Sequence, residues 1–244
     1  MINLRAALIG AAGRMGQAVI GLAKSEGVDI VARIDLGDQL AFADADVAID
    51  FSHAEAAAPI CDAAMKSKIP LVIGTTGHSA KQREDIVAAS KRIAVVLASN
   101  FSVGVNALFA LTESAARILG NDFDLEIVEA HHRMKKDAPS GTAKTLAEIL
   151  QRSRQAKIVR HGREGMVGER GRSEIGIHSV RGGDVVGDHT VIFAGQGERV
   201  ELTHRATSRD TFARGAIRAA HWVIGKSPGL YDMRDVLGLR PEGG

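Results

Sequence analysis

The sequence contains almost no cysteine: Cys61 is the only one among 244 residues. A single cysteine excludes a disulfide within the chain and a zinc site built on cysteine ligands, and it fits a reducing compartment. Cys61 lies in an alanine-rich segment with a helical pattern. We therefore interpret it as a packing residue rather than as a nucleophile.

Aromatic residues and an excess of either charge are also scarce. Phe, Trp and Tyr make up 4% of the chain, so a core has to be built from Ala, Val, Ile and Leu. The 31 Lys and Arg residues against 29 Asp and Glu leave a formal net charge of +2. Nucleic-acid-binding proteins carry a clear excess of basic residues, so no nucleic-acid partner is expected. The 45% of hydrophobic residues is typical of a globular protein with one large domain or two small ones.

Long membrane-type runs are lacking as well. Residues 1–23 begin like an export signal, but Arg14 and several glycines interrupt the apolar run. Residues 93–112 are 20 uncharged residues, the length of a membrane span, but Ser99, Asn100 and Asn106 lie among them. We therefore expect a soluble, cytoplasmic protein with no membrane partner.

The first hundred residues alternate short apolar runs with helical patterns. The predicted strands are Leu4–Ile9, Asp29–Ile34, Val47–Asp50, Leu71–Ile73 and Ala94–Leu97, and the predicted helices are Arg14–Ser25, Glu55–Ser67 and Ala80–Lys91. Strands that are apolar throughout and separated by helices predict a parallel sheet covered on both faces.

The pattern changes after about residue 102. The predicted helices there are Val105–Leu119, Thr142–Arg152 and Thr211–Gly225, and the predicted strands are Asp124–Ala130, Thr190–Ala194 and Arg199–Arg205. A glycine-rich segment between residues 161 and 189 has no predicted element. This region resembles an α+β unit more than a continuation of the parallel sheet.

The turn between the first strand and the first helix carries regularly spaced glycines. Gly10-Ala11-Ala12-Gly13-Arg14-Met15-Gly16 is a G-x-x-G-x-x-G variant of the dinucleotide fingerprint. Such glycines let the chain turn, let the backbone approach a pyrophosphate and let the helix pack on the sheet, while N–H groups at the helix start bind the anion. Arg14 either contacts phosphate or is an ordinary solvated helix residue; the sequence leaves both interpretations open.

An acidic residue stands at the end of the second strand. Asp35 follows Gly16 by about 20 residues, the spacing of a ribose-binding carboxylate. A carboxylate there would repel a 2′-phosphate, and Leu36 offers no cation to bind one, so the pattern favours NADH.

From the strand and helix patterns and the glycine turn, we predict an α/β protein. It has a Rossmann-type parallel-sheet domain of residues 1–102 and 211–244. An inserted α+β domain of residues 103–210 contains a mixed, largely antiparallel sheet.

Two later strand ends carry polar or glycine-bearing turns, at residues 74–77 (G-T-T-G) and 98–102 (A-S-N-F-S). Ligands of open α/β sheets lie just beyond the carboxyl ends of the strands. Both turns are thus placed to line the nicotinamide half of a cofactor, although ordinary turn chemistry explains each of them equally well.

The densest group of cations follows the strand at Asp124–Ala130. Residues 131–136 are H-H-R-M-K-K, and Ser140 then precedes a helix. This loop suits a small anionic substrate, His titrates near neutrality and can donate a proton, and a helix N-terminus offers N–H donors to a carboxylate. The alternatives are a solvated basic face and a simple N-cap at Ser140. No companion ligand stands at metal-binding spacing, so no metal is expected.

Taken together, these motifs resemble the 4-hydroxy-tetrahydrodipicolinate reductase (dihydrodipicolinate reductase) family of bacterial lysine and diaminopimelate biosynthesis. The matching segments lie in the same order along nearly the whole chain: residues 10–16, 50–52 (D-F-S), 74–77, 100–106, 129–143, 180–191 and 231–237. The resemblance implies reduction of a cyclic dicarboxylate, 4-hydroxy-tetrahydrodipicolinate, to tetrahydrodipicolinate with NADH or NADPH. It also implies a homotetramer formed through the sheet of the second domain.

The resemblance implies roles for individual residues. His131 would be a proton donor or acceptor, Lys135 a proton donor and His132 a substrate contact, while Gly141 and Thr142 would hold a substrate carboxylate. The implied cofactor-binding residues are Gly10, Ala11, Ala12, Gly13, Arg14, Met15, Asp35, Gly74, Thr75, Thr76, Ala98, Ser99, Asn100 and Phe101. The chain departs from the family in its short segment after Asp35 and in Leu36, where some relatives have an Arg that favours NADPH.

Two other classes of function are weighed against this one. A semialdehyde dehydrogenase on the same scaffold needs a cysteine nucleophile in the second domain, and this sequence has none there. A non-catalytic cofactor-sensing module needs no proton donors, so the cluster from His131 to Lys135 counts against it.

Overall fold

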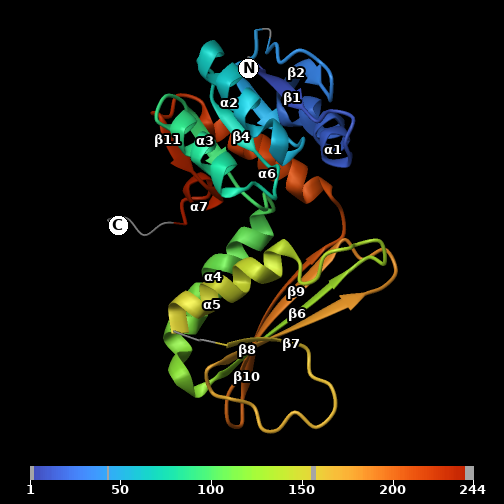
Figure 1. The fold of residues 1–244 in the computed structure, drawn as a ribbon, viewed down its shortest axis with the longest axis vertical. Helices are drawn as coiled ribbons and strands as arrows, with labels where there is room; N and C mark the ends of the chain where they lie inside the picture. The colour runs from blue at the N-terminus through green and yellow to red at the C-terminus, as the bar shows by residue number, and fades with distance from the viewer. Residues whose placement is uncertain (1–2, 43, 155–157, 240–244) are drawn as a thin grey trace. The chain divides into compact units, whose positions relative to one another are not determined.

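The structure is a computed structural model that describes residues 3–42, 44–154 and 158–239. The chain divides into two compact units (Figure 1), the first formed by Met1–Val103 with Arg209–Gly244 and the second by Gly104–Ser208. The sequence-based boundaries fall at residues 102/103 and 210/211, and the structural ones at 103/104 and 208/209.

The first unit is built on a six-stranded sheet with the order β11-β5-β4-β3-β1-β2. Its strands are β1 (Leu4–Ile9), β2 (Val28–Ile34), β3 (Val47–Asp50), β4 (Leu71–Ile73), β5 (Ala94–Leu97) and β11 (Gly229–Tyr231), and all their pairings are parallel. The predicted parallel sheet is confirmed, and β11 is an addition that the sequence did not indicate. The strand order reverses at β1, which lies between β2 and β3. In open α/β sheets ligands bind at this reversal point.

Helices cover both faces of this sheet. They are α1 (Arg14–Ala23), α2 (Ala57–Ser67), α3 (Ala80–Ser90), α6 (Asp210–Val223) and the short α7 (Met233–Val236). Alternate residues of β1 point to opposite faces: Ala6 and Leu8 pack with α1 and α6, and Ala7 and Ile9 with α2 and α3. Figure 1 shows α6 (orange) beside α1 (blue), although the two are far apart in sequence.

Some predicted helices begin or end in a 3₁₀ turn. The first helix ends at Ala23 and continues as a 3₁₀ turn over Lys24–Glu26, and the second is preceded by one over Ala54–Ala56. Cys61 lies on α2 and is buried in the core, as expected for a packing residue, and burial raises the pKa of its thiol to about 12.

The second unit contains a five-stranded sheet with the order β10-β9-β6-β8-β7. The strands are β6 (Asp124–His131), β7 (Ile158–His161), β8 (Glu174–Arg181), β9 (Gly187–Ala194) and β10 (Arg199–Ala206). β9 pairs antiparallel with β6 and β10, whereas β8 pairs parallel with β6 and β7. The predicted mixed sheet is confirmed, but the expectation that it is largely antiparallel is wrong, because two of its pairings are antiparallel and two are parallel. Its parallel half comes from β7 and β8, in and beside the glycine-rich segment that had no predicted element.

Two helices, α4 (Val103–Leu119) and α5 (Gly141–Arg154), pack on one face of this sheet. The side chains of β6 alternate strictly between buried and half-buried positions. Leu125 and Ile127 enter the core formed with the helices, and Glu129 and His131 continue the buried series to the end of the strand. The strand therefore leads from an apolar core into a polar cluster.

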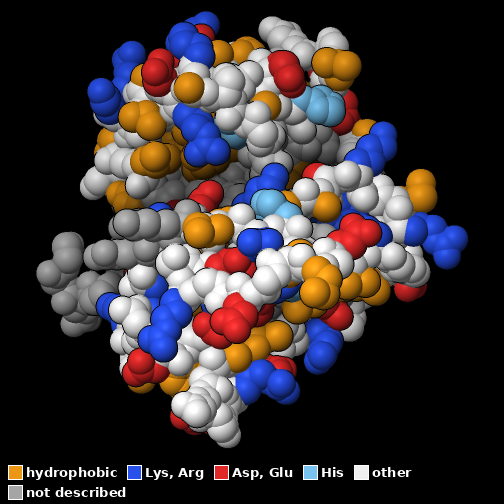
Figure 2. Space-filling view, turned by 60° about the horizontal axis from the view of Figure 1, so that its bottom comes forward, with side chains coloured by type: hydrophobic (Ala, Val, Ile, Leu, Met, Phe, Trp, Pro, Cys, Tyr) orange, Lys and Arg blue, Asp and Glu red, His pale blue; other side chains and the backbone are white. Residues whose placement is uncertain are grey.

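Charged side chains of both signs are interspersed over the face that Figure 2 shows, as the small net charge of +2 leads one to expect. Within the described residues, no helix is long and apolar enough to cross a membrane.

Candidate active site

The glycine turn after β1 is held by close backbone contacts. Gly10 has a φ of 77°, and a Cβ there would lie 2.4 Å from the carbonyl oxygen of Phe51. A Cβ at Gly16 would lie 2.2 Å from the carbonyl oxygen of Gly10, so helix α1 packs directly on the turn. The side chain of Gln17 braces the turn by donating to the carbonyl oxygen of Ala11 at 2.9 Å.

The start of α1 is open to an anion. Gly13 is its N-cap, no side chain caps the helix, and its first turn has no acidic residue. The first N–H groups of a helix have no partner within the helix. Together with the exposed Arg14 and with Met15 they face a cavity of about 630 Å³, which residues 74–77 also line. This N-terminus has the donors and the space that the phosphates of a dinucleotide require.

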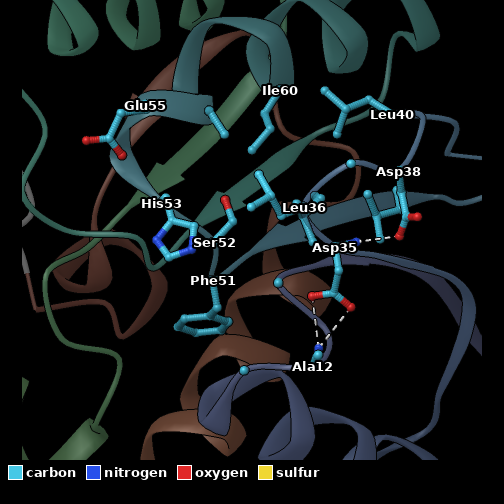
Figure 3. Close-up of a pocket in the computed structure, with 16 residues that line it drawn as sticks. Ala12, Asp35, Leu36, Asp38, Leu40, Phe51, Ser52, His53, Glu55 and Ile60 are labelled. Carbon is cyan, nitrogen blue, oxygen red and sulfur yellow. Dashed lines mark hydrogen bonds between the residues drawn. The ribbon is translucent and has the colours of Figure 1, made fainter.

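Asp35 is fixed to the glycine turn (Figure 3). Its two carboxylate oxygens accept hydrogen bonds from the backbone N–H of Ala12 at 3.0 and 3.1 Å, and Asp38 accepts one from the backbone N–H of Asp35 at 2.8 Å. Both acids line a cavity of about 710 Å³ whose apolar side includes Ile34 and Ile60. The cavity thus offers acceptors for sugar hydroxyls beside an apolar wall.

Sequence reasoning gave no role to the loop after β3, although it borders both cavities. Phe51, Ser52 and His53 line them, and the buried Asp50 stabilises the loop because its Oδ1 accepts from the backbone N–H and the hydroxyl of Ser52 at 2.9 and 2.5 Å. Burial raises the pKa of Asp50. The position of this loop at the carboxyl end of β3, next to β1, was the signal that could have found it.

The predicted cofactor residues are not all brought together. Gly10, Ala12, Gly13 and Asp35 line the larger cavity, and Gly13, Arg14, Met15 and Gly74–Thr76 line the smaller one. Ala11 is buried, and residues 98–101 line neither cavity. Phe101 is a core residue whose ring meets Phe51 edge-on at 6.0 Å.

In the second unit, His131 ends β6 beside a fully buried carboxylate. Its Nδ1 lies 2.5 Å from Oε2 of Glu129, which also accepts two hydrogen bonds from Arg181, at 2.8 and 2.7 Å, and one from the backbone N–H of Ser140 at 3.2 Å. Burial by itself would raise the pKa of Glu129, but the hydrogen bonds from Arg181, Ser179 and His131 outweigh it and lower that pKa to about 2. The carboxylate is therefore ionised.

A second histidine packs against the first. The rings of His131 and His189 meet edge-on with centroids 5.1 Å apart, and Nε2 of His189 is hydrogen bonded to the Ser140 hydroxyl at 2.9 Å. Burial lowers the pKa of His189 to about 3, with a further contribution from His131, so His189 is neutral near pH 7. Burial also lowers the pKa of His131, and the bond to Glu129, which raises it, only partly offsets this effect.

The cationic loop after β6 is anchored to the turn between β8 and β9. The backbone N–H groups of His132 and Arg133 donate to the carbonyl oxygens of Val185 and Gly183, at 2.7 and 3.2 Å. Lys135 is largely covered, its side chain only 21% exposed, and its Nζ lies 2.8 Å from a carboxylate oxygen of Asp137. The backbone of the loop is thus anchored and Lys135 is largely covered, whereas Arg133 and Lys136 are exposed.

The loop ends at the start of α5. The hydroxyl of Ser140 accepts a hydrogen bond from the backbone N–H of Ala143 at 3.2 Å, which makes Ser140 a helix cap as one interpretation held. Gly141 and Thr142 are the first residues of the helix, and the surroundings of Gly141 are open. An ionised carboxylate on an imidazole, an ammonium group and a helix N-terminus together suit proton transfer to an anionic substrate.

Glu129, Arg181 and His189 had no predicted role. The available signal was the spacing of Glu129 and His131, because residues two apart on a strand share one face. Arg181 comes from β8 and His189 from β9, and only the strand pairing brings them here.

Comparison with known proteins gives one consistent result. A family model described as "Dihydrodipicolinate reductase, N-terminus" matches residues 4–101, and one described as "Dihydrodipicolinate reductase, C-terminus" matches residues 104–237. The chain is 56% identical over 237 residues to a 4-hydroxy-tetrahydrodipicolinate reductase of Akkermansia muciniphila, covering 94% of this chain and 96% of that relative. It is 46% identical over 267 residues to one of Thiobacillus denitrificans, covering 98% and 100%.

Among solved structures, the chain resembles a dihydrodipicolinate reductase from Paenisporosarcina sp. TG-14 with dipicolinate bound. The TM-score is 0.76 at 25% identity, over 94% of this chain and 97% of the other. The similarity therefore extends over both units.

Proposed function

The chain belongs to the dihydrodipicolinate reductase family, and we propose that it reduces 4-hydroxy-tetrahydrodipicolinate to tetrahydrodipicolinate in diaminopimelate and lysine biosynthesis. The observation that carries this proposal is the match of both family models, one on each unit. The family resemblance predicted from the sequence is confirmed, and with it the class of NAD(P)H-dependent oxidoreductase.

We assign cofactor binding to the first unit. A reduced nicotinamide cofactor supplies the hydride of the family's reaction. The N-terminus of α1 would hold the phosphates with Gly10–Met15, Asp35 would accept from the ribose hydroxyls, and residues 74–76 and 98–101 would bind the nicotinamide half. The open helix start and the carboxylate-rimmed cavity support this assignment for the phosphates and the ribose.

We further propose that NADH is used in preference to NADPH or comparably with it. Asp35 and Asp38 place two carboxyl groups at one cavity, where a 2′-phosphate would be repelled. Leu36, which is 96% exposed beside them, provides no cation to bind the phosphate.

We assign substrate binding and protonation to the second unit. His131 would donate or accept the proton that accompanies hydride addition to the ring, Lys135 would donate a proton, and His132 would contact the substrate. The N-terminus of α5, at Gly141 and Thr142, would hold a substrate carboxylate. The family's reaction consumes one hydride and one proton and releases the 4-hydroxyl group as water.

We also propose that the chain forms a homotetramer in the cytoplasm. The family resemblance implies a cytoplasmic homotetramer formed through the sheet of the second unit. Helices α4 and α5 pack on one face of that sheet, and every second residue of the edge strand β10 up to Arg205 is exposed. Light scattering on the purified protein would measure the mass of the assembly against the chain mass of 25.8 kDa.

A coupled assay tests the function. The condensation product of pyruvate and aspartate semialdehyde is supplied, and the absorbance of the reduced cofactor is followed with NADH and NADPH in parallel. Loss of absorbance that depends on this product is expected. A folded chain that binds the cofactor but turns over with neither one would contradict the proposal and favour a cofactor-sensing module.

A further inference from the structure

We propose that Glu129 is a positioning residue that holds the His131 imidazole with a proton on Nδ1, so that Nε2 is the nitrogen that exchanges a proton with the substrate. The inference rests on the proposed role of His131 and adds to it a positioning residue and the ring nitrogen through which the proton is transferred. After an imidazolium has given up its Nε2 proton, the remaining neutral ring carries its proton on Nδ1. That is the tautomer that a carboxylate bonded at Nδ1 stabilises.

The geometry fixes which ring nitrogen is engaged. Glu129 and His131 lie two residues apart on β6 and point to the same face, which brings Nδ1 to 2.5 Å from Oε2 of Glu129. On the other side of the ring, a Cβ at Gly187 would lie 3.1 Å from Nε2. A larger side chain at this position would crowd Nε2, so the glycine leaves space beside this nitrogen.

The remaining contacts of Glu129 keep it an acceptor. It is completely buried, and the two arms of the Arg181 guanidinium each donate to one of its oxygens. This bidentate pairing stabilises the ionised form of Glu129, because two hydrogen bonds from a charged arginine offset the desolvation of a buried carboxylate. A charged Glu129 can only accept hydrogen bonds, so the ring nitrogen that faces it has to carry a proton.

Charged and titratable groups from several elements face His131. Burial lowers the pKa of His131 most, Glu129 on the same strand raises it, and Lys135 in the loop and Arg181 on β8 lower it further; His189 on β9 is neutral near pH 7. Among these charged groups, Glu129 has the largest effect on the pKa of His131, and it is the one that favours the imidazolium.

The same carboxylate also holds the helix that is assigned to the substrate carboxylate. Its Oε1 accepts from the backbone N–H of Ser140, the residue immediately before Gly141 and Thr142. Arg181 in turn donates to the carbonyl oxygen of Asp137 at 2.7 Å, within the same loop. The ion pair of the buried Glu129 with the half-buried Arg181 therefore positions both the imidazole and the start of α5.

The first test needs no change at Glu129. In protein labelled with ¹⁵N-histidine, NMR distinguishes Nδ1–H from Nε2–H, and the signals lost in His131→Gln identify the ring. We expect the neutral His131 ring of the unsubstituted protein to carry its proton on Nδ1. A neutral ring with its proton on Nε2 overturns the proposal, whatever the turnover.

The second test compares two carboxylate-to-amide changes on one strand. Glu129→Gln removes the charge next to His131. Glu126→Gln is the matched control, because Glu126, like Glu129, is paired with arginine and histidine (here Arg163, Arg170 and His178) but lies on the opposite face of β6. Both variants lose a half-buried or buried ion pair, and only one of these pairs contacts His131.

For Glu129→Gln we expect a loss of the Nδ1–H tautomer and a fall in kcat of about 10²-fold or more. We also expect the alkaline decline of kcat to begin about one pH unit lower, because removing the anion lowers the pKa of a proton donor that must be charged. Glu126→Gln should change neither the tautomer nor the pH profile.

Equal pH profiles for the two variants would overturn the proposal. If the tautomer changes in Glu129→Gln while both this variant and His131→Gln keep full turnover, then the proton role of His131 fails and the positioning role fails with it. If His131→Gln loses turnover but Glu129→Gln does not, only the positioning role is overturned.

Discussion

The carboxylate of Asp35 is bonded through both oxygens to the backbone N–H of Ala12, at 3.0 and 3.1 Å. The acid at the end of β2 is thereby tied to the glycine turn after β1. Its negative charge sits at the rim of the larger cavity, and Asp38 adds a second carboxyl group there. A ribose with free hydroxyls would meet hydrogen-bond acceptors at this rim, whereas a 2′-phosphate would meet two carboxyl groups.

Cofactor preference follows from this arrangement. The unsubstituted chain should have a kcat/KM for NADH at least comparable to that for NADPH. Leu36→Arg should raise kcat/KM for NADPH about tenfold, which corresponds to about 1.4 kcal/mol, because it adds a cation beside the ribose site. Leu36→Gln, which introduces a polar side chain without a charge, is the control. It should change the ratio of kcat/KM for NADPH to kcat/KM for NADH little. An unsubstituted chain that favours NADPH tenfold would contradict the assignment.

Protonation is expected to depend on two residues of the cationic loop. His131→Gln and Lys135→Ala should each lower kcat by about 10²-fold or more, since each removes a proposed proton donor, and should leave the Kd of the cofactor nearly unchanged. The neighbouring exposed Lys136 offers a control, and Lys136→Ala should keep kcat. Steady-state kinetics and cofactor titration measure both quantities. Wild-type kcat in both test variants would show that the proton donors lie elsewhere.

Two glycines of α1 should respond oppositely to the same substitution. Gly16→Ala places a methyl group 2.2 Å from the carbonyl oxygen of Gly10, so it should destabilise the first unit by about 1–3 kcal/mol and weaken cofactor binding. Gly21→Ala meets nothing within 4 Å and should stabilise the helix by about 0.5–1 kcal/mol. Urea denaturation compares them. Equal stability of the two variants would refute the packing role of Gly16.

Acid should destabilise the second unit from about pH 6.5 downwards. The pKa of His189 is about 3 in the folded chain, against an ordinary value of 6.5, so between these values the unfolded chain binds more protons. Stability is then lost as the pH falls, by about 2 kcal/mol between pH 6.5 and 5. Glu129, whose pKa is lowered to about 2, adds to the loss only below about pH 4.5.

Urea midpoints across pH 5–7 measure this slope. His189→Gln should flatten it, and His161→Gln, at an exposed position at the end of β7, should not. A slope that is the same in His189→Gln and in the unsubstituted chain would show that another group titrates on unfolding.

The secondary structure of the first unit was largely predictable because its central strands β3, β4 and β5 are buried on both faces and are therefore mostly apolar. The strand that the sequence did not predict, β11, has only three residues and lies at the sheet edge, so its sequence shows no periodicity. In the second unit, β8 was not predicted because it lies within the glycine-rich segment and itself contains Gly176. Gly176 lacks a side chain because the carboxylate of Glu126 fills that space, and sequence alone gives no such reason for a glycine.

The site was predictable to a different degree in each unit. The glycine turn could be predicted because the end of β1, the turn and the start of α1 are adjacent in the chain. Asp35 could be predicted because it ends the next strand at a regular distance from the turn. The loop after β3 escaped prediction because only the sheet order places Phe51 and Ser52 next to the glycine turn. Likewise, Arg181 reaches Glu129 from 52 residues further along the chain.

The sequence by itself determined the local features of this protein: a turn that only glycine can form at Gly10, a run of apolar strands, and an alternation on β6 that commits Glu129 and His131 to one face. These depend on steric limits and side-chain period within a few residues. The tertiary structure alone decided which ring nitrogen of His131 is bound, which carboxylate Arg181 keeps ionised and which loops border the cavities. Those relationships arise from strand pairing, which joins residues with no regular spacing between them.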